Sequence, residues 1–239
     1  MPRVLIEVTP DPARVSAGGR GAADPADADT VGVAVDVLRA TSTLIVARRN
    51  GAAAVVPFAG IAAALALRDR TPGALVCGER DGAIVPGFDL GNSPFEYTAE
   101  RVAGRTLAFA STNGSRAMLS QWGCRVRLLG AFLNASAVSR ACADAQRVRI
   151  TCAGDRGQPS QEDLACAGWI AAALVERGFE PVGTDTALAI AAAPRDAAEV
   201  RAAVEGAPHA RVLARLGEEF RRDVVFCATL DAVPEPQAW

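Results

Sequence analysis

An aspartate and an arginine stand where a predicted strand ends, at positions 36 and 39. The alternating valines of residues 33–37 are typical of a strand, and Thr41 or Ser42 can cap the helix that follows. Because ligands of open α/β sheets bind at the carboxyl ends of strands, Asp36 and Arg39 could hold a cation and an oxyanion together. An ion pair with a purely structural role is the alternative.

The same pairing of an acid with a guanidinium recurs after another predicted strand, at Glu79 and Arg80. Farther along this loop, Asp89 is a candidate catalytic base, although aspartate also suits turns. Ser93 and Glu96 have the spacing of a capping box, which predicts a structural role for Ser93. Glu79, Arg80 and Asp89 are therefore the candidate catalytic residues of this stretch.

A cluster of hydroxyl and amide groups lies between a predicted strand and a predicted helix, in residues 111–116. Hydroxyls, free backbone amides and the positive end of a helix can bind a phosphate, and a guanidinium adds a two-pronged donor. An Asn-Gly turn with a capping hydroxyl is the alternative for all but the arginine. The predicted substrate-binding residues here are Ser111, Thr112, Asn113, Gly114, Ser115 and Arg116, with Asn134 in a similar but weaker setting.

Two adjacent acids, Glu162 and Asp163, open a predicted helix after the glycine-rich residues 152–157. Adjacent carboxylates beside such a loop suit Mg²⁺, which prefers hard oxygen ligands. Ser160 and Asp163 also have the spacing of a capping box, which would make Asp163 structural. Both interpretations of the pair stay open.

Composition excludes several kinds of chemistry. All 25 basic residues are arginines. The absence of lysine excludes a P-loop and a Schiff-base mechanism, because both need that residue. The net charge of −2 argues against a nucleic-acid-binding protein. The one histidine, His209, lies in a Pro- and Ala-rich region and is expected to be an exposed loop residue.

The six cysteines lie mostly inside apolar runs and lack Cys-x-x-Cys spacing, so we expect reduced core residues of a cytoplasmic protein. The N-terminus has no signal-peptide pattern, and no apolar run reaches membrane-spanning length without a charge. We therefore expect no membrane partner.

Strand and helix patterns alternate along the chain as βαβ units do. The predicted strands are residues 3–8, 33–37, 53–58, 74–77, 106–110, 126–131, 148–152 and 223–227. The predicted helices are residues 42–50, 61–70, 115–122, 135–143 and 161–177, and 184–216 with breaks at Pro194 and Pro208. The pattern indicates one α/β domain over residues 1–239, a three-layer α/β/α fold with a largely parallel or mixed sheet that could consist of two similar halves. We expect a flexible loop at residues 10–30 and a loose tail from residue 234.

Six motifs together resemble the 2-phosphosulfolactate phosphatase family. They occur in the family's order between about Val31 and Cys227: VDVLRATST, CGERDGAIVPGFDLGNSP, STNGSRA, FLNASAV, CAGDRGQPSQEDLACAG and LGEEFRRDVVFC. The family pattern resembles TTNGT at the positions where residues 111–115 of this chain are STNGS. Each of the two differences replaces one hydroxyl side chain with another. The resemblance implies a Mg²⁺-dependent hydrolase that converts 2-phosphosulfolactate to 3-sulfolactate and phosphate, a step associated with coenzyme M synthesis.

The residues suit this chemistry, since arginine forks and a metal ion can clamp a small, highly anionic phosphorylated substrate. Asp36 is the first candidate metal ligand, with Glu162 and Asp163 as partners. Arg39, Arg80 and Arg116 would hold the phosphate, carboxylate and sulfonate in an order left open, and Glu79 or Asp89 would activate water. A covalent intermediate on Asp36 is a secondary hypothesis.

Two other functional classes remain open: a Mg²⁺-dependent lyase or isomerase acting on a phosphorylated carboxylic acid, and a non-catalytic anion-binding protein. Carboxylates beside a bound anion favour an enzyme, because an anion binder gains nothing from them. The chain could also form a homo-oligomer.

Overall fold

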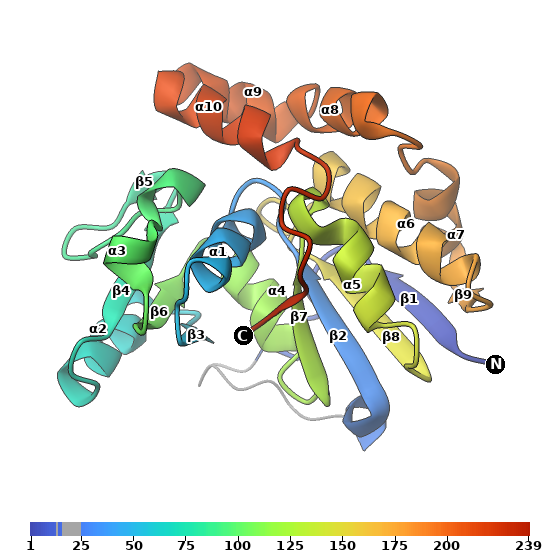
Figure 1. Ribbon diagram of the computed structural model, residues 1–239, viewed down its shortest axis with the longest axis horizontal. Helices are drawn as coiled ribbons and strands as arrows, with labels where there is room; N and C mark the ends of the chain where they lie inside the picture. Colours follow the sequence, from blue (N-terminus) through green and yellow to red (C-terminus); the bar gives the residue numbers. More distant parts are fainter. Residues whose placement is uncertain (13, 16–24) are drawn as a thin grey trace.

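Two β-sheets form the frame of the protein (Figure 1). The computed structural model describes residues 1–12, 14–15 and 25–239. The larger sheet has the strand order β10-β7-β2-β8-β1-β9, in which β10 runs antiparallel to β7 and the other neighbours are parallel. Its strands are β1 (Arg3–Glu7), β2 (Thr30–Val35), β7 (Val126–Gly130), β8 (Arg147–Cys152), β9 (Glu180–Val182) and β10 (Gln237–Ala238).

The smaller sheet has the order β3-β6-β4-β5, with β5 antiparallel to β4. Its strands are β3 (Ala54–Pro57), β4 (Leu75–Arg80), β5 (Ala83–Ile84) and β6 (Thr106–Ala110). The parallel βαβ rhythm predicted from the sequence is confirmed, but it builds two separate sheets.

Helices cover both faces of the larger sheet, which gives the predicted three-layer α/β/α arrangement. Helices α1 (Ala40–Arg49) and α4 (Gly114–Ser120) pack on one face, and α5 (Ala135–Ala141), α6 (Gln161–Val175) and α7 (Thr184–Ala191) lie on the other. Helix α4 contacts both β2 and β3, so it lies between the two sheets, while α2 (Ile61–Arg70) packs on β4 and β6. Shorter elements are η1 (Pro25–Asp29), η2 (Pro94–Glu96), α3 (Ala99–Val102) and η3 (Phe132–Asn134).

Three C-terminal helices lie across the end of the molecule where the parallel strands finish (Figure 1). They are α8 (Ala197–Glu205), α9 (Pro208–Leu216) and α10 (Glu218–Cys227). The predicted strand at residues 223–227 is therefore wrong, because this stretch is the end of α10. Val224 and Cys227 are both buried and lie three residues apart, which is a helical spacing. In a short apolar run this spacing cannot be distinguished from the pattern of a buried strand.

The chain end also differs from the sequence-based expectation. Gln237 and Ala238 pair with Leu129 and Leu128 of β7, so these two residues form an edge strand and not a loose tail. Pairing with β10 covers the outer edge of β7, where backbone N–H and C=O groups would otherwise lack partners in the sheet. Of the predicted loop at residues 10–30, residues 13 and 16–24 lie outside the described part of the chain, and Pro25–Asp29 form η1.

The core explains why the central strand reads as almost continuously apolar. All six residues of β2 are buried, as expected for a strand covered on both faces. All six cysteines are buried and form no disulfide. Within the described residues, no helix is long and apolar enough to span a membrane.

Candidate active site

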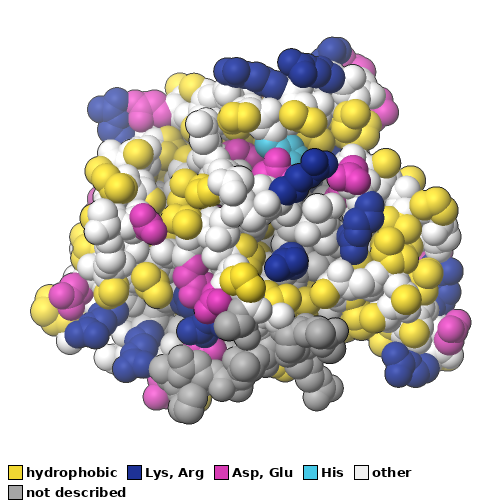
Figure 2. Space-filling model, turned by 180° about the vertical axis from the view of Figure 1, so that it is seen from behind, with side chains coloured by type: hydrophobic (Ala, Val, Ile, Leu, Met, Phe, Trp, Pro, Cys, Tyr) yellow, Lys and Arg dark blue, Asp and Glu magenta, His cyan; other side chains and the backbone are white. Residues whose placement is uncertain are grey.

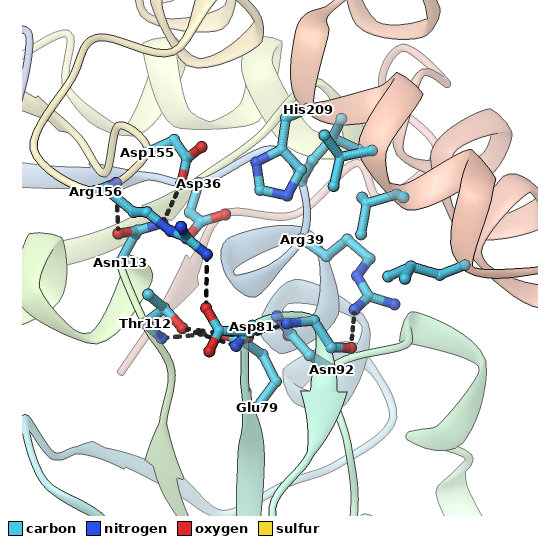
Figure 3. Close-up of a pocket in the computed structure, with 15 residues that line it drawn as sticks. Asp36, Arg39, Glu79, Asp81, Asn92, Thr112, Asn113, Asp155, Arg156 and His209 are labelled. Carbon is cyan, nitrogen blue, oxygen red and sulfur yellow. Dashed lines mark hydrogen bonds and ion pairs between the residues drawn. The ribbon is translucent and has the colours of Figure 1, made fainter.

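A cavity of about 270 Å³ opens where the carboxyl ends of strands from both sheets meet (Figure 3). The loops after β2, β4, β6 and β8 supply its polar wall, and α9 supplies an apolar one. Its size is at the lower end of ligand sites, which suits a small molecule. The lining residues are Asp36, Leu38, Arg39, Glu79, Asp81, Gly82, Asn92, Thr112, Asn113, Asp155, Arg156, His209, Val212, Leu213 and Leu216.

Asp36 is held at the end of β2 by the turn that leads into α1. Its Oδ1 accepts a hydrogen bond from the backbone N–H of Ala40 at 3.1 Å. The Thr41 hydroxyl accepts from the Asp36 N–H and donates to the carbonyl of Gly130, which ties this turn to β7. The carboxylate therefore has a fixed position at the cavity wall.

Burial, together with the negative charges of Glu79 and Glu162, raises the pKa of Asp36 to about 7, against the opposing effects of the Ala40 N–H and Arg39. A carboxyl group with such a pKa changes protonation near neutral pH. Strongly shifted carboxyl groups in clefts are typical of functional sites. This observation favours a chemical role for Asp36 over the structural alternative.

Asp163 connects the loops that follow β2 and β8. Its Oδ1 accepts from the N–H of Val37 at 2.8 Å, and its Oδ2 accepts from the N–H of Gly154 at 3.1 Å. The predicted capping box with Ser160 is absent, since no side-chain bond caps α6 there. Burial, together with the charges of Asp36 and Glu162, raises the pKa of Asp163 well above its usual range.

Glu162 is also buried, at 2% exposure, but neither it nor Asp163 lines the cavity. The charge of Glu162 raises the pKa of both Asp36 and Asp163, so the two buried acids are part of the surroundings of Asp36 without reaching the cavity.

Glu79 joins the loops of the smaller sheet. One of its carboxylate oxygens accepts from the N–H of Thr112 at 2.7 Å, and the other accepts from the N–H of Gly82 at 2.8 Å and the Thr112 hydroxyl at 3.3 Å. Asn113 reaches across to the larger sheet, because its amide oxygen accepts from the N–H of Arg156 at 3.2 Å. Side chains of both sheets thus form one wall (Figure 3).

Within the predicted phosphate seat, Ser111 and Ser115 bind each other's backbone amides at 3.0 and 2.9 Å and hold the turn. Gly114 allows α4 to approach Asp36, since an added Cβ would lie 2.5 Å from Asp36 Oδ2 and would overlap the Cβ of Ala40. Of this motif, only Thr112 and Asn113 line the cavity.

Four further predicted site residues also lie outside the cavity. Arg80 donates to the carbonyls of Glu79 and Ala59, and Arg116 is an exposed residue of α4. Asp89 accepts from the N–H of Val76 and from Arg68, both at 2.8 Å. Asn134 caps a turn, with bonds to Ala131 and Leu129.

Sequence reasoning missed several residues of this cavity. His209 was expected to be an exposed loop residue, yet it is half-buried in α9 and lines the cavity. Asp81, Asp155 and Arg156 are not among the predicted site residues, although Asp155 and Arg156 follow closely on a predicted strand, as Asp36 does, and this position is a signal for a site residue. From behind, acidic, basic and histidine side chains gather beneath the C-terminal helices (Figure 2).

The donor set fits a hard cation that keeps part of its water shell. No three His, Cys, Asp or Glu side chains in the described chain are arranged to hold a metal ion by themselves. Mg²⁺ commonly takes one or two carboxylates, with waters and substrate phosphate completing its shell. Asp36 is one such carboxylate, and the buried Asn92 Oδ1 has no hydrogen-bond partner among the described residues.

Comparisons with known proteins agree on one family. Residues 21–235 match the family model described as 2-phosphosulpholactate phosphatase. The chain is 35% identical over 199 residues to a probable 2-phosphosulfolactate phosphatase of Thermotoga petrophila, which covers 83% of this chain and 84% of that protein. It is 38% identical over 208 residues to the similarly named protein of Symbiobacterium thermophilum, which covers 85% and 88%.

Proposed function

Because this chain belongs to the 2-phosphosulpholactate phosphatase family, we propose that it hydrolyses 2-phosphosulfolactate to 3-sulfolactate and phosphate with the help of Mg²⁺. Its enzyme class is that of the phosphoric monoester hydrolases. The observation that carries the proposal is the meeting of Asp36, Arg39 and Glu79 in one small cavity at the strand ends. We extend the proposal to a cytoplasmic enzyme of coenzyme M synthesis.

The charge of the cavity supports the need for a cation. Its lining contains four carboxylates and two guanidinium groups, and both guanidinium groups already form ion pairs with acids. A phosphorylated sulfonate carries several negative charges, so such a wall would repel it unless positive charge were added. A Mg²⁺ ion held by Asp36 would supply that positive charge beside the phosphoryl oxygens. The Asn92 oxygen lines the same cavity and has no hydrogen-bond partner among the described residues, whereas Glu162 and Asp163 are buried outside the cavity.

The remaining residues of the cavity have separate tasks in this proposal. Arg39 binds the phosphoryl group, because its guanidinium lies three residues from Asp36 in the same loop. Glu79 accepts the proton of the attacking water, since it lines the cavity while the other predicted base, Asp89, does not. Thr112 and Asn113 offer polar atoms from the opposite loop.

A phosphate-release assay over small phosphorylated acids, with and without Mg²⁺, tests the function. We expect release from 2-phosphosulfolactate that stops in EDTA and returns with Mg²⁺ or Mn²⁺. Full turnover in chelator would contradict the metal requirement. A changed carbon skeleton without free phosphate would instead indicate a lyase or isomerase.

A further inference from the structure

The guanidinium of Arg39 is fixed on several sides. Its Nη1 forms an ion pair with Asp223 Oδ2 at 2.7 Å, and its Nη2 donates to the carbonyl of Gly82 at 3.1 Å. The ring of Phe220 lies against its face, with 4.8 Å between the arginine Cζ and the ring centroid. An arginine has five N–H donors, so these two bonds leave others for a ligand in the cavity that Arg39 lines.

Asp223 belongs to α10, far from Arg39 in the sequence, and it is fully buried. Its second oxygen, Oδ1, accepts from the Ser93 hydroxyl at 2.6 Å. Ser93 was expected to act only as a helix cap. Its N–H does donate to Glu96 at 3.3 Å, but its hydroxyl points to Asp223. Both oxygens of Asp223 therefore have partners that fix its orientation.

We propose that Asp223, oriented by Ser93, is the positioning residue that holds Arg39 for binding the phosphoryl group of the substrate. Through Asp223, helix α10 contributes to the active site by orienting Arg39, although Asp223 itself does not line the cavity. This inference rests on the function proposed above and deepens it.

The burial of this pair supports a role beyond stability. The two side chains are 4% and 1% exposed. Removing two charges from water is costly, and apolar residues of similar size often stabilise a protein as well as a buried ion pair does. Fixing a planar donor before the anion arrives also lowers the entropy cost of binding. A small displacement of such a group can slow a reaction about 100-fold.

The test measures the binding of inorganic phosphate by calorimetry in the presence of Mg²⁺, together with KM and kcat for the phosphorylated substrate. We expect Asp223→Asn to weaken phosphate binding about 10-fold or more and to lower kcat/KM by a similar factor. In an Arg39→Lys background the same substitution should have little further effect, because Asp223 acts through Arg39. Ser93→Ala should shift phosphate binding in the same direction by a smaller factor.

Asp27→Asn is the matched control. Asp27 is a buried acid that pairs with the buried Arg149, and it lies outside the cavity. We expect this variant to lose thermal stability while keeping phosphate affinity and kcat/KM.

Unchanged phosphate affinity in Asp223→Asn, or equal effects in the wild-type and Arg39→Lys backgrounds, would overturn the inference. If Asp223→Asn does not fold, Ser93→Ala decides, because unchanged phosphate affinity there also overturns it. If the wild-type protein binds phosphate in an Asp223-dependent way but releases none from any phosphorylated acid, only the proposed function fails.

Discussion

Asp36 shows how far the sequence can predict a single residue. The strand pattern placed it at a carboxyl end, and the structure puts it in the cavity wall with Arg39. The local sequence could not reveal Asp223 or Ser93 as partners of Arg39, because the contact joins segments that are far apart in the chain. Ser93 also belongs to a local capping box with Glu96, which accounts for a serine at this position without any contact to Asp223.

Asp36→Asn should lower turnover at least ~100-fold, as expected for the loss of a key electrostatic group. The amide keeps the shape and can still accept the hydrogen bond from Ala40. Steady-state kinetics should show this loss, whereas Asp89→Asn, outside the cavity, should retain most activity. Turnover near the wild-type level in folded Asp36→Asn would leave Asp36 with a structural role only.

The same substitution should change how stability depends on pH. The pKa of Asp36 is raised from 3.8 to about 7, so between these values the folded state binds more protons than the unfolded state. The contribution of Asp36 to the free energy of unfolding is therefore most favourable at low pH, and it is lost as pH rises through the folded-state pKa. In EDTA, the melting temperature of Asp36→Asn should exceed that of the wild type more at about pH 8 than at about pH 5. A constant difference would contradict the raised pKa.

At the scale of elements, the long alternating segments were predicted well. The helix predicted at residues 61–70 is α2, and the strand predicted at residues 106–110 is β6. The error at residues 223–227 arose because a short apolar run is compatible with the repeat of a buried strand and with that of a helix. Helix α9 was predicted, but the sequence did not show that its face with His209 and Leu213 lies over the strand ends.

The close approach of α4 to α1 gives a prediction at this scale. Gly114→Ala should lower both activity and melting temperature, because the added Cβ would overlap Ala40 and press on Asp36. Gly60→Ala is the control, since a Cβ at that helix N-cap meets no atom within 4 Å. Activity assays and thermal melts of the two variants should differ clearly. Equal behaviour would mean that α4 can shift without disturbing the site.

At the scale of the whole molecule, the sequence predicted alternating strands and helices but not their division into two sheets. Helix α1 ends at Arg49 with Asn50 as its C-cap, and the chain then leaves the larger sheet to build β3. Helix α4 contacts both sheets, so the same βαβ pattern continues across the division. Nothing in hydrophobic periodicity marks which strand pairs with which.

Because both sheets and the C-terminal helices contribute to the cavity, a ligand should stabilise the whole fold. Inorganic phosphate with Mg²⁺ at about 100 times its Kd should add roughly 2.7 kcal/mol to the free energy of unfolding. For a chain of this size the melting temperature should rise by about 5–10 °C in a thermal melt. Arg39→Lys should reduce the shift, and an unchanged wild-type melting temperature would contradict binding at this site.

The order of Arg39 and Asp223 along the chain also bears on biosynthesis. A ribosome makes Asp36, Arg39 and the strands that carry them long before it makes α10 and β10. Until these two elements have been made, Arg39 lacks its acidic partner and β7 lacks the strand at its edge. Phosphate binding would therefore mature only after α10 has been made and folded, and the edge of β7 would be protected only after β10 has followed.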